Sequence, residues 1–267
     1  MPTSFLRLLR GRIAVIFIVL PLTWIFLSQP LLGAEPGFEN TSKTFIKIIN
    51  SNDRNKIADV IVYPLRREVP LPSLETKSQF LQHFDEVFDE QLLKAIASSN
   101  IASDWANMGW RGIMFRDGIL WLDDNGKITS INYLTEQAKS ERARLIDSER
   151  KKLHSSLRQF IEPVLEWKTK DYRVRIDRIN ESKFRYAAWS ALKITTEKPD
   201  IILENGTLFF DGSGGNHYYD FRTGVYLYRC LVNEIGTEDT PPGELEVYKN
   251  NKVILRQPAT EVIPASE

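Results

Sequence analysis

The chain has 267 residues, and its 35 Lys and Arg side chains balance its 35 Asp and Glu side chains. This balance excludes a nucleic-acid-binding protein with a strongly basic surface, because such a surface needs an excess of clustered Lys and Arg. The one cysteine, Cys230, excludes a disulfide within the chain. It lies in a segment of alternating character that predicts a strand, so we interpret it as a buried structural thiol.

The first 34 residues have the form of an export signal. Three arginines between residues 7 and 12 precede an uncharged run over residues 13–34. The small residues Gly33 and Ala34 supply a cleavage site, so we expect a signal peptide whose removal leaves Glu35 at the new N-terminus. The alternative is an uncleaved membrane anchor, since the run is just long enough to cross a hydrocarbon core of about 30 Å. Both interpretations predict a periplasmic or secreted protein.

Residues 35–136 predict helices followed by β-hairpins. Two short helices are expected after capping positions at Thr41 or Ser42 and at Asp53. A longer helix is expected from Thr76, because a broad apolar stripe recurs at helical spacing up to Ile96. Three strands are then expected at residues 112–115, 119–122 and 128–133, with tight turns at Asp117-Gly118 and Asn125-Gly126.

The rest of the chain changes in character twice. Residues 137–163 are dense in Glu, Lys and Arg with only a narrow apolar seam, which predicts a solvated connecting helix at a domain boundary. Residues 164–258 predict a β-rich domain, and their short strands between turn residues favour a small antiparallel barrel or sandwich. Residues 259–267 are expected to be a flexible tail. The predicted fold class is therefore α+β.

Three segments of the first domain resemble the NTF2-like (cystatin-like α+β) superfamily: residues 53–65, 80–89 and 112–121. The resemblance extends over residues 41–134 and concerns packing. It implies an NTF2-like cone, in which helices pack on a curved antiparallel sheet and leave a conical apolar cavity. Some members of the superfamily use this cavity as an active site and many only bind, so the resemblance does not choose between them. The β-rich domain carries no comparable resemblance.

His83 is the candidate for catalysis in such a cavity. With Asp85 it would form a general acid–base pair, which is the usual proton-transfer chemistry of pockets of this kind. The competing interpretation is an ordinary surface histidine, since His83 precedes the stripe residue Phe84 and is expected to point away from the stripe.

A glycine-rich segment, residues 211–222, is the candidate for binding. It carries a mixture of aromatic and polar side chains suited to recognition: His217, Tyr218, Tyr219 and Arg222. The competing interpretation is a plain hairpin that connects two strands. Strand alternation places Tyr218 and Tyr219 on opposite faces, so we expect one to be structural and the other free.

The remaining patterns are negative. The sequence has no cluster of metal ligands and no nucleophile with orienting partners, so we expect no metal, no cofactor and no catalytic residue. The predicted function is that of an exported, non-enzymatic binding or accessory protein. Its expected partner is an envelope or secreted protein or a cell-wall component outside the cytoplasm, and the membrane is involved only through an uncleaved N-terminus. The alternative is an NTF2-like enzyme that uses His83 and a carboxylate.

Overall fold

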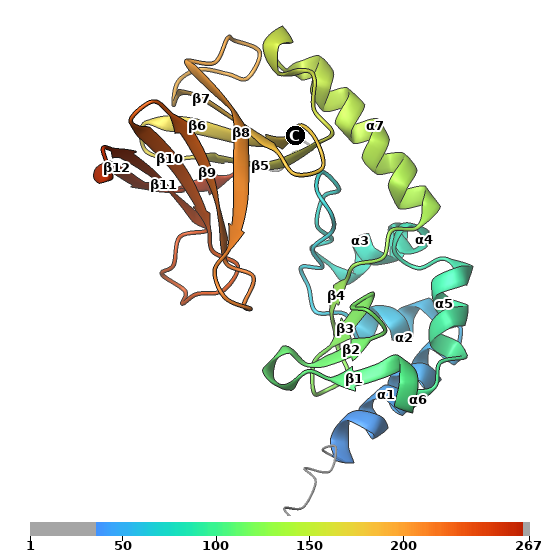
Figure 1. Ribbon diagram of the computed structural model, residues 1–267. Helices are drawn as coiled ribbons and strands as arrows, with labels where there is room; N and C mark the ends of the chain where they lie inside the picture. Colours follow the sequence, from blue (N-terminus) through green and yellow to red (C-terminus); the bar gives the residue numbers. More distant parts are fainter. Residues whose placement is uncertain (1–35, 264–267) are drawn as a thin grey trace, which may run out of the picture. The chain divides into compact units, whose positions relative to one another are not determined.

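The computed structural model describes residues 36–263 (Figure 1). The expected export signal, residues 1–34, and the last residues of the expected tail, 264–267, lie outside the described residues. The protein is α+β, with a four-stranded antiparallel sheet and a nine-stranded antiparallel sheet. No helix within residues 36–263 is long and apolar enough to cross a membrane.

Six helices precede the first sheet: α1 (Pro36–Asn50), α2 (Arg54–Asp59), α3 (Lys77–Gln82), α4 (Phe84–Val87), α5 (Glu90–Ala97) and α6 (Ile101–Asp104). Helix α2 begins where expected, because the Asp53 side chain accepts hydrogen bonds from Asn55 N and Lys56 N. Helix α1 begins at Pro36, so the expected cap at Thr41 or Ser42 was wrong and both residues lie inside the helix.

The long helix expected from Thr76 is three short helices, so this prediction was wrong. The chain is extended at Phe88, and the Asp89 side chain then accepts a hydrogen bond from Leu92 N and begins α5 anew. Phe80, Phe84 and Phe88 still pack together, with ring centroids 5.6 to 6.2 Å apart. The apolar stripe therefore arises because these residues share one core, although they do not form one continuous helix.

The small sheet has the order β1 (Trp105–Asn107), β2 (Ile113–Phe115), β3 (Leu120–Leu122) and β4 (Ile128–Ile131), with a 3-10 helix at Gly109–Arg111. Both predicted hairpin turns are confirmed, because Gly118 and Gly126 adopt positive φ angles of 86° and 79°. Trp105, Phe115 and Leu120 belong to one core that includes residues of α1 to α5.

Helix α7 (Glu136–Lys152) and a 3-10 helix (Ser155–Leu157) lie where the connecting helix was expected. Although α7 is mostly charged, its residue Ile146 is buried against Ala187 and Trp189 of the next sheet, together with Leu153 and Leu157, which follow the helix. The second half of α7 is therefore packed on that sheet and is not a free connector.

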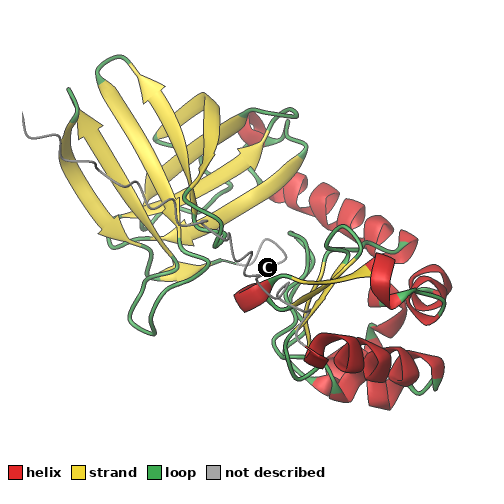
Figure 2. Cartoon of the chain, turned by 60° about the horizontal axis from the view of Figure 1, so that its bottom comes forward, coloured by secondary structure: helices red, strands yellow, loops and turns green. Residues whose placement is uncertain are grey.

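The large sheet is an antiparallel half-barrel. Its strands are β5 (Glu162–Lys168), β6 (Tyr172–Arg178), β7 (Phe184–Ser190), β8 (Ile201–Phe210), β9 (His217–Thr223), β10 (Tyr226–Val232), β11 (Gly243–Lys249), β12 (Lys252–Pro258) and β13 (Glu261–Val262). Neighbours in sequence are neighbours in the sheet, except that β13 pairs with β5. The sheet curls around a common interior (Figure 2).

The expected flexible tail is a strand over its described part. Glu261 pairs with Lys168 and Val262 with Trp167, and Ala259 is buried. The chain therefore leaves one edge strand, β12, and passes directly to the other edge of the sheet. In place of a loose tail, Ala259 N donates to Gly243 O of β11, and Thr260 N and Ile263 N donate to carbonyl oxygens of β5.

Two glycines allow large rings into the half-barrel interior. A Cβ atom on Gly206 would lie 2.1 Å from the ring of Phe221, and one on Gly243 would lie 2.0 Å from the ring of Trp167. Both distances are shorter than any tolerated contact, so only glycine fits at these positions. Trp167 and Phe221 fill the interior together with other apolar side chains such as Val174, Ile176 and Leu245.

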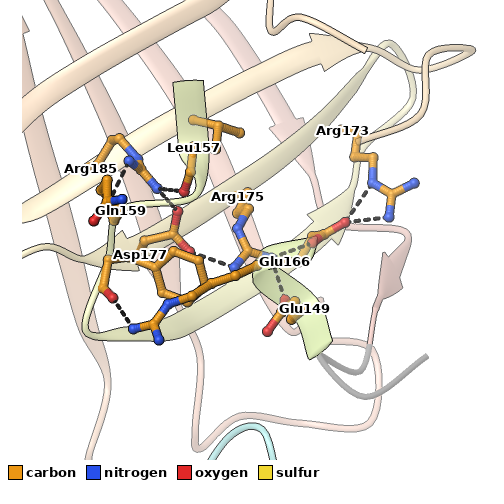
Figure 3. A network of polar contacts seen from close by, with 10 residues as sticks. Glu149, Leu157, Gln159, Glu166, Arg173, Arg175, Asp177 and Arg185 are labelled. Carbon is orange, nitrogen blue, oxygen red and sulfur yellow. Dashed lines mark hydrogen bonds and ion pairs between the residues drawn. The ribbon is translucent and has the colours of Figure 1, made fainter. Parts of the chain in front are cut away.

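The outer face of the half-barrel under α7 buries a cluster of charges (Figure 3). Arg175, only 1% exposed, donates to Glu149 of α7 and to Glu166 of β5. Its Nη2 atom lies 2.6 Å from Asp177 Oδ1, and Asp177 Oδ2 lies 2.6 Å from Arg185 Nη2. Arg185 also donates to the carbonyl oxygens of Leu157 and Gln159. These contacts join α7, the segment after it and three strands.

We expect Gly243→Ala to destabilise the half-barrel, because the added methyl group would overlap the Trp167 ring. Overpacking of this kind costs about 1–3 kcal/mol of unfolding free energy. The matched control is Gly37→Ala in α1, where a Cβ atom meets nothing within 4 Å. Chemical denaturation should show a loss for the first variant only, and equal stability of the two variants would contradict this packing.

Candidate functional site

The structure separates the proposed catalytic pair. Asp85 is exposed and forms an ion pair with Arg54, whose Nη2 atom lies 2.7 Å from Asp85 Oδ1. His83 instead contacts Glu86, with 2.8 Å between His83 Nδ1 and Glu86 Oε1. His83 and Asp85 are therefore two residues apart in sequence but belong to different polar contacts.

Glu86 is held as a carboxylate by two partners. Its other oxygen, Oε2, lies 2.6 Å from Nη1 of the buried Arg67. Burial by itself would raise the pKa of Glu86, but the hydrogen bonds from His83 and Arg67 outweigh it and lower the pKa. A general base near neutral pH needs a raised carboxylate pKa, so Glu86 is a poor proton acceptor and a good orienting partner.

The four candidate binding residues all lie on β9 but do not form one site. Tyr219 is buried in the half-barrel, where its ring packs edge-on to Phe184 with centroids 4.9 Å apart. His217 and Tyr218 are half-buried near the β8–β9 turn. Arg222 is exposed at the opposite end of the strand, roughly 17 Å from His217 at the usual rise of a strand.

Tyr218 belongs to a layered stack on the outer face of the sheet. Its ring is stacked on Phe209 of β8, with centroids 5.1 Å apart and planes 18° from parallel. The guanidinium group of Arg229 lies 4.1 Å from the centroid of the Tyr218 ring. Arg229 is fixed in turn by Asp220, through contacts of 2.7 and 2.8 Å to the two carboxylate oxygens. This stack orients Tyr218 before any partner arrives.

We name the four aromatic side chains at this end of the β8–β9 hairpin the aromatic tip: Phe209, Phe210, His217 and Tyr218. Phe209 is 42% exposed and Phe210 is 71% exposed. The rings of Phe210 and His217 lie 6.1 Å apart. The hairpin therefore presents aromatic side chains on both of its faces.

The turn beyond the aromatic tip is attached to a second loop. The side-chain oxygen of Asn216 accepts hydrogen bonds from Glu234 N and Ile235 N, at 2.8 and 2.9 Å. Its amide nitrogen donates to Ile235 O at 3.3 Å. Gly212 and Gly215 adopt positive φ angles of 72° and 95°, which explains part of the glycine content of this segment.

Sequence reasoning missed Phe209, Asn216 and Arg229. The signal that could have found them is strand register, which aligns Phe209 of β8 with Tyr218 of β9 and Asp220 of β9 with Arg229 of β10. The sequence does not by itself fix the register of these strands, so it does not predict which residues are neighbours across them.

The remaining candidates for chemistry are metal-ligating side chains and the cysteine. Within residues 36–263, no group of three or more His, Cys, Asp and Glu side chains is close enough to hold a metal ion. Cys230 is buried in the half-barrel, and burial raises the pKa of its thiol, which suits a structural role.

Comparison of the chain with families of known sequences, with curated proteins and with solved structures finds no significant match.

The lowered pKa of Glu86 predicts a pH-dependent contribution to stability. A carboxylate whose folded pKa is depressed stabilises the fold above its ordinary pKa of 4.5, and this contribution is lost as the pH falls through the folded value. We therefore expect Glu86→Gln to lower the unfolding free energy more at pH 7 than at pH 3. The control is Glu75→Gln, at an exposed position with no ion pair among residues 36–263. An equal loss at both pH values would contradict the assignment.

Proposed function

We propose that the protein is a non-enzymatic binding protein that recognises a protein partner through the aromatic tip. The observation that carries this proposal is the stack of Phe209, Tyr218 and Arg229, which is ordered by Asp220 and yet leaves aromatic surface exposed. Tyr and Arg are enriched among the side chains that dominate protein–protein binding energies.

Preorganisation supports the same proposal. Association loses affinity when side chains and loops must be ordered at the interface. Here Tyr218 is held by the Phe209 ring and the Arg229 guanidinium group, and the adjoining turn is held by Asn216. Little ordering would remain for a partner to impose.

We further propose that the protein acts outside the cytoplasm, periplasmic or secreted, because of the export-type pattern of residues 1–34. In this setting the partner would be another envelope or secreted protein, and cell-wall material is the alternative. The likeness of residues 41–134 to NTF2-like packing is part of the proposal, and it rests on the order of helices and hairpins.

The second candidate function is an enzyme, favoured by the 2.8 Å contact between His83 and Glu86. Glu86 would orient the imidazole and His83 would move the proton, so Asp85 has no role in this version. The depressed pKa of Glu86 and the half-exposed position of His83 make this candidate the weaker one.

We expect a photo-crosslinking amino acid at Phe210 to give one discrete adduct in an envelope extract of the source organism. The matched control places the same group at Trp110, which is 74% exposed and lies in the first half of the chain. Adducts at both positions, or at neither, would contradict recognition by the aromatic tip.

We expect two neighbouring tyrosines to separate binding from stability once that adduct is identified. Tyr218→Ala should weaken binding of the identified partner by about 1–3 kcal/mol, as loss of an interface hot spot does. Tyr219→Ala should instead lower the unfolding free energy by about 3–5 kcal/mol, because it empties a buried aromatic position. Calorimetric titration and chemical denaturation measure the two effects. Unchanged binding by Tyr218→Ala would place the functional surface elsewhere.

A further inference from the structure

The edge strand β12 meets the β5–β6 turn. The β12 side chain Gln257 accepts hydrogen bonds there from Thr169 Oγ1 at 2.8 Å and from Asp171 N at 3.2 Å. Ala259 N donates to Gly243 O at 2.8 Å, where the chain passes from β12 to β13. These contacts connect β12 to the opposite side of the curled sheet.

The half-barrel holds a cavity of about 400 Å³. This volume lies in the usual range of small-molecule pockets, roughly 300–1,000 Å³. Much of its wall is apolar and comes from opposite sides of the curled sheet, with Ala188 and Ile201 facing Leu245, Val247 and Leu255. The cavity opens beside the edge strand β12, where a register shift against β11 leaves Ile254 56% exposed at the rim.

Four tyrosines line this one cavity: Tyr172 of β6, Tyr186 of β7, and Tyr226 and Tyr228 of β10. The rings of Tyr186 and Tyr228 lie 5.6 Å apart, and Tyr186 also packs on Phe221 at 5.5 Å. Phenol side chains are amphipathic, with an apolar ring for the core and a hydroxyl that seeks a hydrogen-bond partner when buried. Four of them converging on one cavity would supply such hydroxyls to a guest molecule.

The Tyr186 hydroxyl is the decisive group. The side chain is only 1% exposed, yet no group within residues 36–263 forms a hydrogen bond with its hydroxyl. The oxygen is also not sealed within the core, as the unpartnered Trp167 Nε1 is, so it borders the cavity. Because this hydroxyl faces the cavity and has no protein partner among the described residues, it is available to form a hydrogen bond with a ligand there.

The charge of the cavity limits what that ligand is. Of the described residues that line it, only Asp200 is charged, and its carboxylate is occupied by Lys193 and by Ser190 N at 2.8 Å. No Lys or Arg lines the described wall to neutralise an anionic head group. Burial raises the pKa of Tyr186 and of Tyr228, so these hydroxyls stay neutral at physiological pH. A charged guest would therefore lose its hydration without gaining an ion pair.

We propose that the half-barrel cavity binds an uncharged, largely apolar molecule through a hydroxyl or carbonyl oxygen. The oxygen of this molecule hydrogen-bonds to the Tyr186 hydroxyl. Its apolar body lies along Leu245, Val247 and Leu255 and reaches the rim at Ile254. This site is separate from the aromatic tip and does not depend on the function proposed for the tip.

Three probes that share a ten-carbon chain and differ in the head group test the proposal: 1-decanol, decanoate and decyltrimethylammonium. Each is titrated at pH 7 into the full chain, below its aggregation threshold, and followed by calorimetry. We expect 1-decanol to bind with one-to-one stoichiometry and at least about tenfold more tightly than either ion, because only the ions bury an unpaired charge.

Tyr186→Phe removes the decisive hydroxyl and nothing else. We expect it to weaken 1-decanol binding about threefold to tenfold, which is the worth of one hydrogen bond. Its thermal midpoint should not fall, since the hydroxyl has no partner to lose. The matched control is Tyr248→Phe, which removes a hydroxyl that contacts Glu246 on β11 and does not line the cavity. This control should leave 1-decanol binding unchanged.

Three results would overturn the proposal. One is binding of decanoate or the ammonium probe as tight as that of 1-decanol, and another is unchanged 1-decanol affinity in Tyr186→Phe. The third is the absence of saturable binding by all three probes. Each result concerns the cavity alone, so it leaves the function proposed for the aromatic tip to its own test.

Discussion

The buried charges around Arg175 are the constraint on which the arrangement of α7 and the half-barrel depends. A guanidinium group that is 1% exposed must have its charge matched inside the protein, and the matching carboxylates come from α7, β5 and β6. Ion pairs of this kind add little net stability, but the loss of one partner is costly. Burial raises the pKa of Glu149 despite the nearby charge of Arg175. Burying the cluster therefore costs desolvation free energy. Its effect is to fix which part of α7 meets which part of the sheet.

The buried charges lie on the outer face of the sheet, and a cluster of aromatic side chains lies on its inner face. Strand β7 is buried on both sides, since Ala187 and Trp189 pack toward α7 while Phe184, Tyr186 and Ala188 face the interior. The sheet curls over those interior rings, and its glycines admit the largest of them. The cavity lined by the four tyrosines lies within the same interior. Phe209 and Tyr218 of the aromatic tip lie on the outer face of β8 and β9.

Local features of the sequence predicted a good part of this fold. The α+β class, the capping of α2 by Asp53 and the turns at Gly118 and Gly126 all follow from patterns within a few residues. The single helix from Thr76 was wrong, because a stripe of core residues does not reveal a local cap such as Asp89. The expected tail was wrong over residues 259–263, because its partner strand lies almost a hundred residues away in sequence.

The sites were harder to predict for the same reason. The contacts of Tyr218 with Phe209 and Arg229 depend on the register of three strands, which alternation alone does not set. The convergence of Tyr172 and Tyr186 with Tyr226 depends on the curl of the sheet. The Arg175 cluster was missed because the sequence places its members in a charged helix and in strands that resemble exposed ones. Export and the likeness to NTF2-like packing remain proposals made from the sequence.

The central claim is that the Arg175 cluster holds the second half of α7 on the half-barrel, and native-state hydrogen exchange of Arg175→Met tests it most directly. The variant leaves Glu149 and Asp177 buried without their partner, and release of the helix is the cheapest way to rehydrate them. The account predicts that amides of residues 146–152 lose protection by about a hundredfold or more relative to those of β6. Equal loss of protection in α7 and β6, or no loss in α7, would contradict it.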